Sequence, residues 1–395
     1  MKKKVVVGAA LMMMPLVSFA GGYLTNTNQH AAFLRSLSRG AAIDIDGALS
    51  NPAGLSFLPT DGFRVGVSIQ SAFQTRDIDA SFGTYSGFDP VNKVPTVSDV
   101  PYKKYYKGKA AAPVIPSVFA AYKKGDWTIS GFFAITGGGG KASFDDGLPM
   151  FESAAMAGIF QESLGKYING ESPIVTPDMY TINSAMDGKQ YIYSLQLGLS
   201  YKITDWLSAF AGGRMNYFSG NYDGYLDAKL KKDFGGTDLM NLALDCDQTG
   251  WGLTPVLGVD VKYGKFNFGA KYEFKTNLNI ENNTKKLDYP DSAEDLIGPY
   301  KHGVNTPNDI PSMLSVAASY QFLPMLKASV EYHFFDDKKA GMAGGKQKEL
   351  ERGTNEYLFG IEWDVIKLRI MVCLIISKAM LVSPVTLIRW ALVLR

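Results

Sequence analysis

Hydrophobic and polar residues alternate in many segments of this chain after residue 61. In 190–203, for example, Tyr191, Tyr193, Leu195, Leu197 and Leu199 are separated mostly by polar or small residues. A period of two places each set on one face of a β-strand. The pattern predicts ten strands, near 62–76, 115–124, 127–136, 190–203, 206–220, 250–263, 266–280, 310–323, 325–336 and 355–366.

Alternation alone also fits a soluble sandwich, whose apolar face would be its core. Three features favour a barrel in a membrane. The segments are long enough to cross a bilayer at a tilt. Aromatic residues such as Tyr191 and Tyr201 end the apolar faces, as expected at the two lipid–water interfaces. Short turns alternate with long connections near 80–112, 141–189, 223–248, 282–308 and 337–354. We therefore predict an all-β protein, a transmembrane antiparallel β-barrel.

Composition agrees with this prediction. Among 395 residues, 40 Lys and Arg nearly balance 38 Asp and Glu, so no charge excess suggests a nucleic-acid partner. A mean hydropathy of −0.04 argues against a helical membrane protein, whereas a barrel averages its lipid-facing and lumen-facing residues. With only Cys246 and Cys373, neither a disulfide framework nor a cysteine-rich metal site is supported, and no cofactor or metal is expected.

The N-terminus has the pattern of a signal peptide. Lys2, Lys3 and Lys4 precede the apolar run Val5–Val17, and Ser18-Phe19-Ala20 supplies small residues at the two positions that a signal peptidase reads. We predict a signal peptide over 1–20 and export from the cytoplasm. The alternative is an ordinary buried N-terminal helix.

Residues 21–60 fit neither the signal peptide nor the barrel, which we place at 61–367. Ala31–Arg39 has a weak helical pattern, and Ser50-Asn51-Pro52-Ala53-Gly54 has turn-forming residues. A short, polar, irregular element of this kind fits inside a barrel lumen as a plug, or hatch.

These residues carry a resemblance to the FadL/TodX family of outer-membrane transporters for long-chain fatty acids and other hydrophobic compounds. The matching positions are Gly22-Tyr23, the stretch from His30 to Arg39, Ile45-Asp46-Gly47, and Ser50 to Gly54. The resemblance covers roughly 21–367 and implies a fourteen-stranded barrel with an N-terminal hatch. It also implies the outer membrane of a Gram-negative bacterium, insertion by the barrel-assembly machinery, and a monomer.

The resemblance implies transport without a chemical reaction. A hydrophobic small molecule would bind among the extracellular loops, the hatch would rearrange, and the molecule would leave sideways into outer-membrane lipid. Asn51, Pro52, Ala53 and Gly54 are the candidate gating residues, although they also fit an ordinary turn before the first strand. Gly137, Gly138, Gly139 and Gly140 end the third predicted strand and weaken its pairing. They are the candidate lateral opening, or a flexible exit into a loop.

Ligand-binding candidates lie on one predicted helix and on the lumenal face. A helix over 151–167 places Met156, Ile159, Phe160 and Leu164 on one apolar face. This face forms a ligand cleft or packs the loop on itself. Apolar residues in lumenal phase suit a hydrophobic cargo or contact with the hatch: Phe119, Phe132, Phe210, Val256 and Leu358. Arg214 and Lys271, in the same phase, pair with a carboxylate head group or form structural ion pairs.

The final residues, 368–395, differ from the rest. They are apolar, contain no Gly, lack strand alternation and do not end in an aromatic residue. We predict that a frameshift replaced the true last strands, and the alternative is a functional helical tail. Ten strands of an expected fourteen would then be present.

Other functions fit the sequence less well. A general diffusion porin predicts a charge-dominated lumen and leaves the hatch unexplained. A non-transport barrel such as an adhesin is compatible with any barrel sequence. An outer-membrane hydrolase has only His30, His302 and His333 as histidine bases, none with a local nucleophile motif. We therefore predict that the protein is not an enzyme.

Overall fold

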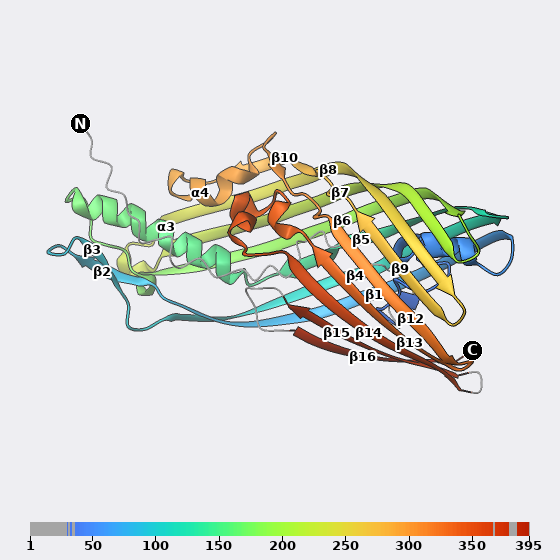
Figure 1. The fold of residues 1–395 in the computed structure, drawn as a ribbon. Helices are drawn as coiled ribbons and strands as arrows, with labels where there is room; N and C mark the ends of the chain where they lie inside the picture. The colour runs from blue at the N-terminus through green and yellow to red at the C-terminus, as the bar shows by residue number, and fades with distance from the viewer. Residues whose placement is uncertain (1–29, 31, 34–35, 366–367, 379–384, 395) are drawn as a thin grey trace.

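Long antiparallel strands dominate the computed structural model (Figure 1). It describes residues 30, 32–33, 36–365, 368–378 and 385–394. The predicted signal peptide, 1–20, and the family-like positions Gly22-Tyr23 lie outside the described residues. One hydrogen-bonded path contains β1 (Gly62–Phe82), β4 (Tyr102–Lys124), β5 (Trp127–Phe144), β6 (Tyr180–Lys202), β7 (Leu207–Leu230), β8 (Asp238–Tyr263), β9 (Phe266–Glu273), β12 (Met313–Leu323), β13 (Leu326–Phe335), β14 (Thr354–Val365), β15 (Leu368–Lys378) and β16 (Val385–Leu394).

Smaller elements extend this wall at the end opposite the short turns (Figure 1). β10 (Asn279–Asp288) pairs with β8, β11 (Asn305–Pro307) pairs with β10, and β2 (Tyr85–Asp89) with β3 (Val94–Val97) forms a separate hairpin. The helices α3 (Pro149–Ile168) and α4 (Glu294–Ile297) lie at the same end. The remaining 3-10 helices are η3 (Pro177–Met179), η4 (Lys232–Phe234), η5 (Asp291–Ala293), η6 (Gly298–Tyr300), η7 (Asp337–Lys339) and η8 (Ala343–Glu349). Among the helices of the described residues, none has the length and apolarity needed to cross a membrane.

All ten predicted strands are present, in the predicted order, although the strand predicted at 266–280 ends at Glu273 in β9. The apolar residues on the outer faces are exposed; Leu197 of β6, for example, has 61% of its surface exposed. The alternate residues of the same strand, such as Gln196 and Ser200, are buried on the inner face. Aromatic residues align across neighbouring strands, because Tyr193 pairs with Tyr217 and Tyr217 with Trp251. The apolar residues thus face outward from a barrel and not into the core of a sandwich, which confirms the predicted fold class.

The predicted strand ends are wrong at the end where the helices lie. β4 begins at Tyr102 instead of near 115, and β8 begins at Asp238 instead of near 250. Much of the predicted connections 80–112, 141–189 and 223–248 is therefore strand. Apolar alternation reports only the part of a strand that faces lipid. Beyond it the backbones continue to pair, but in β8 the apolar residues Met240 and Leu242 are buried on the inner face against α3. The lipid-facing pattern therefore ends before the strand does.

The tail also differs from the prediction. Leu368–Lys378 pairs with β14, and Val385–Leu394 pairs with Leu368–Lys378, so two strands follow where we expected none. Ile, Val and Leu suit strands, and backbone pairing does not require alternating side chains. The frameshift, which concerns the coding DNA, stays a prediction.

The hatch lies inside the barrel near the short turns (Figure 1). It contains α2 (Gly47–Ser50) and η2 (Ala53–Phe57), and both are largely buried. Contacts between η2 and strands β4 to β8 place it within the lumen. The predicted plug is confirmed for the described part of the segment.

Candidate transport path: hatch, wall break and outer helix

The turn between α2 and η2 is fixed by side chains of the barrel wall. Asn51 Nδ2 donates to Asp260 Oδ2 at 2.6 Å and to the carbonyl of Ala42 at 3.3 Å. Ser200 Oγ donates to the carbonyl oxygen of Pro52, and Ser208 Oγ to that of Ala53, each at 2.7 Å. All four predicted gating residues, Asn51, Pro52, Ala53 and Gly54, are buried. The turn is therefore held by named hydrogen bonds, because a buried carbonyl needs a donor.

Further wall side chains satisfy other hatch carbonyls on the same side. Gln196 Nε2 donates to the carbonyl of Ala48 and Lys271 Nζ to that of Leu49, each at 2.7 Å. Asn267 Nδ2 donates to the carbonyl of Ala41 at 3.0 Å. These donors come from the inner faces of β6 and β9, so directional bonds hold the hatch against this part of the wall.

Arg39 anchors the start of the hatch. Its guanidinium donates to both carboxylate oxygens of Asp46, at 2.9 and 2.6 Å, and lies 3.5 Å from Glu362 of β14. Burial acts to raise the pKa of Asp46, but the charge and hydrogen bonds of Arg39 outweigh it and hold that pKa below its usual range. The Gly40 amide donates to Glu331 of β13 at 2.8 Å. The hatch is thus also tied to β13 and β14.

The opposite side of the hatch is apolar. It meets β4 and β5 through a cluster of buried residues: Ala48, Leu49, Leu55 and Leu58 of the hatch with Phe119, Ala121, Phe132 and Ala134 of the wall. Phe119 and Phe132 stack at 5.4 Å between ring centroids. Dispersion and burial are non-directional, so such a contact shifts more readily than a set of hydrogen bonds. In the described part of the hatch, hydrogen bonds to the wall therefore lie on one side and this apolar packing on the other.

The wall is interrupted directly beyond this apolar contact. The β4–β5 ladder runs as far as Ser117 paired with Ala134 and resumes only at Ala111 paired with Lys141. In between, β4 has Pro113 and Pro116, and proline has no amide hydrogen to give to a ladder. We call this interruption the β4–β5 break.

The predicted glycine run forms the other side of the β4–β5 break. Gly138 and Gly140 adopt φ of +93° and +74°, a backbone region that favours glycine. The β5–β6 register shifts on both sides of Gly137. The prediction that strand three ends here is wrong, because β5 continues to Phe144. Ile135, at the start of the break, pairs with Tyr193 of the aromatic row.

The predicted helix is confirmed as α3, and its apolar face is covered. Met156, Ile159 and Phe160 are buried and Leu164 is half-buried. Met156 and Ile159 belong to a cluster with wall residues of β6 to β8 and with two residues near α4: Tyr180, Leu226, Ala228, Met240, Leu242, Ala293 and Ile297. A cleft of about 30 Å³ beside Phe151 is the open space there, too small for a drug-sized ligand. In this conformation the face packs the loop onto the barrel.

A buried carboxylate ties α3 to two strands. Glu152 Oε1 lies 2.7 Å from Lys104 Nζ and accepts from Ser184 Oγ at 2.7 Å. Its Oε2 accepts from the Tyr106 hydroxyl at 2.8 Å. The side chain is fully buried, and these partners compensate its charge. The first turn of α3 is thereby fixed to β4 and β6.

The charged lumenal candidates form ion pairs with one carboxylate. Arg214 is 0% exposed, and its Nη2 lies 2.8 Å from Glu273 Oε1. Lys271 Nζ lies 2.7 Å from the same oxygen. Of the two possibilities for these cations, the structure favours the structural ion pair. The lumenal apolar candidates Phe132 and Phe210 are buried, as are Phe119, Val256 and Leu358.

Sequence reasoning missed the wall residues that hold the hatch. Asp260, Ser200 and Ser208 lie in lumenal phase, and small polar residues at that phase were the available signal. The prolines of β4 were a second missed signal, since proline is rare in a central strand. Within the described part of the chain, no group of three or more His, Cys, Asp or Glu residues is arranged to hold a metal ion.

The fold and the enclosed hatch define a class: a transmembrane-type antiparallel β-barrel plugged by its own N-terminal segment. Its fold is similar to that of a FadL homologue from Pseudomonas aeruginosa, with a TM-score of 0.56 and 15% identity over 91% of this chain and 82% of that one. Two toluene transporters give lower TM-scores. TodX of Pseudomonas putida gives 0.49 with 12% identity, covering 90% of this chain and 85% of its own. TbuX of Ralstonia pickettii gives 0.48 with 13% identity, covering 85% and 82%.

Sequence comparison adds nothing to this likeness. No family model matches the chain, and no curated protein matches it. The fold of the FadL homologue is thus recognised through structure, at an identity that shows the fold alone.

Proposed function

We propose that this protein carries hydrophobic small molecules, long-chain fatty acids among them, across the outer membrane of a Gram-negative bacterium. The cargo enters among the extracellular loops beside α3, passes into the lumen, and leaves through the β4–β5 break into lipid. No bond is made or broken. Transfer of apolar surface from water to protein and then to lipid supplies the free energy.

One observation supports this proposal: the β4–β5 break lies beside the largest apolar cluster between the hatch and the wall, which joins the hatch to β4 and β5. Leu49 and Leu55 pack against the strands that flank the break, while hydrogen bonds hold the other side of the hatch. Movement of the apolar side away from Phe119 and Phe132 exposes aromatic surface next to the break. A hydrophobic cargo can replace the lost contacts there, because it offers the same kind of surface.

The same arrangement opposes free diffusion of polar solutes. The lumen near the short turns is filled by the hatch, whose residues Ala48, Ala53 and Leu55 are 0% exposed. A diffusion porin needs a water-filled passage lined by polar residues. In the described residues, this part of the lumen is instead filled by packed side chains of the hatch.

The test uses bacterial cells that lack their own transporter of this kind and express the whole chain. Initial uptake of radiolabelled oleate and of toluene is compared with uptake of lactose. We expect oleate, toluene or both to enter several-fold faster than in cells with an empty vector, and lactose to enter at the vector rate. Faster lactose entry with unchanged oleate and toluene would identify a general porin and overturn the proposal.

A further inference from the structure

A second break in the wall lies beside β8. The β8–β9 ladder ends at Val256 paired with Glu273, and the β8–β10 ladder begins at Thr249 paired with Glu281. Between these points, 250–255 have no ladder partner on this side among the described residues, and one backbone bond, from Phe274 N to Pro255 O, remains at 3.0 Å. Pro255 cannot donate to a ladder, as expected at a free strand edge.

The segment between Glu273 and Glu281, which would otherwise continue the wall beside β8, turns into the barrel. Thr276 bridges to Ile310 through two backbone bonds of 3.0 Å, and Leu278 N donates to Asp309 Oδ1 at 3.1 Å. Leu278 is 0% exposed and Ile280 is also buried. Both belong to one buried cluster with Ile192 of β6, Phe218 of β7 and Ile310. This apolar cluster closes the second break on the lumenal side.

Two glycines of β8 allow the inward turn. A Cβ on Gly250 would lie 2.4 Å from the carbonyl oxygen of Asn279, and one on Gly252 would lie 2.5 Å from that of Asn277. Side chains at these positions would clash with the backbone of 277–279 in its present path. The inward path of 277–279 therefore depends on these two glycines of β8 as well as on the segment's own residues.

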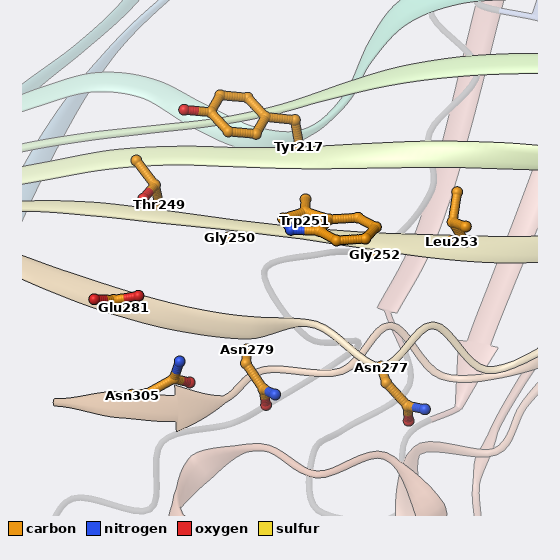
Figure 2. Close-up of a pocket in the computed structure, with 10 residues that line it drawn as sticks. All are labelled: Tyr217, Thr249, Gly250, Trp251, Gly252, Leu253, Asn277, Asn279, Glu281 and Asn305. Carbon is orange, nitrogen blue, oxygen red and sulfur yellow. The ribbon is translucent and has the colours of Figure 1, made fainter. Parts of the chain in front are cut away.

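On the outer surface the inward turn leaves a cleft of about 550 Å³ (Figure 2). One side is formed by Tyr217, Trp251 and Leu253 on the outward faces of β7 and β8. Trp251 is 66% exposed and belongs to the aromatic row with Tyr217 and Tyr193. The cleft therefore lies at the level where lipid head groups meet hydrocarbon.

The other side of the cleft is polar. Asn277, Asn279, Glu281 and Asn305 line it and are exposed (Figure 2). Within the described residues, no hydrogen bond or ion pair involves any of these four side chains. Amide and carboxylate groups that face lipid without partners are unfavourable, so this position calls for a polar occupant.

We propose that the cleft binds the sugar head group of a glycolipid from the surrounding outer leaflet. The proposal rests on the membrane placement in the proposed function. Asparagine amides both donate and accept, which matches hydroxyl groups, and Glu281 accepts further hydroxyl hydrogens. Trp251 offers a flat apolar face to a sugar ring, and exposed Leu253 lies beside it for the acyl chain. No lysine or arginine lines the cleft, so a phosphate would find no opposite charge.

The test measures fluorescence of Trp251 in the full chain, with Trp127, Trp206, Trp363 and Trp390 replaced by Phe. The protein is reconstituted in phosphatidylcholine nanodiscs containing increasing fractions of a brominated lipid, whose bromine atoms quench tryptophan on contact. One series uses a brominated monoglucosyl diacylglycerol, and the other a brominated phosphatidylcholine with the same chains. We expect half-maximal quenching at a roughly fivefold lower fraction of the glycolipid, as a few added hydrogen bonds would give.

Paired substitutions test each part of the cleft. Asn277→Leu with Asn279→Leu should abolish the preference, and Glu281→Ala with Asn305→Ala should do the same from the far end. Gln161→Leu, which removes an exposed amide on α3, should leave it unchanged. Heat-modifiable mobility on a gel checks that each variant is folded.

Three results would overturn the proposal. They are equal quenching by the two lipids in the parent, stronger quenching by the phosphocholine lipid, and a preference that survives both folded double variants. Free methyl glucoside, which lacks chains, should not displace the glycolipid at millimolar concentration; displacement would identify a soluble saccharide as the occupant and reject the membrane source. If neither brominated lipid quenches Trp251, the membrane placement fails, and with it the proposed function.

Discussion

At the scale of single residues, the lumen contains a buried cluster of three charged side chains. Arg214 and Lys271 share one carboxylate, Glu273, and all three side chains are buried. Two cations and one anion leave an excess positive charge, which Gln196 helps to solvate through its bond to Arg214 Nε at 3.1 Å. Removal of the anion would leave both cations without their closest partner.

We predict that Glu273→Gln destabilises the folded barrel by about 3–5 kcal/mol, the usual effect of breaking a buried ion pair from one side. Urea unfolding of the refolded protein in detergent, followed by tryptophan fluorescence, measures this difference. Glu171→Gln on the exposed loop after α3 is the control and should leave the midpoint where it is. An unchanged midpoint for Glu273→Gln would show that the ion pairs do not hold the wall together.

Asn51 makes the corresponding point for the hatch. Its amide reaches Asp260, a residue 209 positions later in the chain. No local pattern in the sequence carries that information, because either partner alone is only a polar residue near a turn or in a strand. The turn itself was predictable from Asn51-Pro52-Ala53, but its attachment was not.

We predict that deletion of 51–54 reduces oleate uptake by at least about tenfold and raises ion conductance, because the hydrogen bonds that seat the hatch are lost. Pro52→Ala keeps the carbonyl that Ser200 binds and should have a smaller effect in the same direction. Oleate uptake by cells and conductance in planar bilayers provide the two readouts. Unchanged values in both would count against the hatch assignment.

At the scale of elements, alternation identified strands because lipid contacts one face and lumen the other. It located β6 at 190–203, although the strand runs over 180–202, since its first part faces no lipid. It could not locate β15 and β16, whose sequence has no alternation. The β4–β5 break was predicted only in part: the glycines at 137–140 were recognised, but Pro113 and Pro116 of β4 were not.

We predict that Pro113→Thr with Pro116→Thr slows oleate uptake several-fold, because the restored amides extend the β4–β5 ladder across the break. Pro255→Thr, which adds the same kind of donor at the second break, is the matched control and should leave uptake unchanged. Initial uptake rates at equal surface expression decide between them. Equal rates for the double variant and the parent would exclude the β4–β5 break as the exit.

At the scale of the whole molecule, the attachments of the hatch are unequal around the barrel. Directional hydrogen bonds join it to β6–β9 and β12–β14, while apolar packing joins it to β4 and β5. A tilt about the fixed side therefore separates the hatch from the strands that border the β4–β5 break. The proposed transport of a hydrophobic molecule requires that this separation occur.

The most direct test tethers the hatch to β5. Ala48 and Ala134 are both fully buried in the shared apolar cluster, and both are replaced by Cys in a chain whose own Cys246 and Cys373 are Ser. Mass spectrometry after alkylation confirms the disulfide. Initial oleate uptake should fall to the vector rate when the pair is oxidised and recover on reduction with dithiothreitol, while the chain with Ala48→Cys alone should not respond. Uptake that is equal in the oxidised and reduced states would contradict a path that depends on hatch movement.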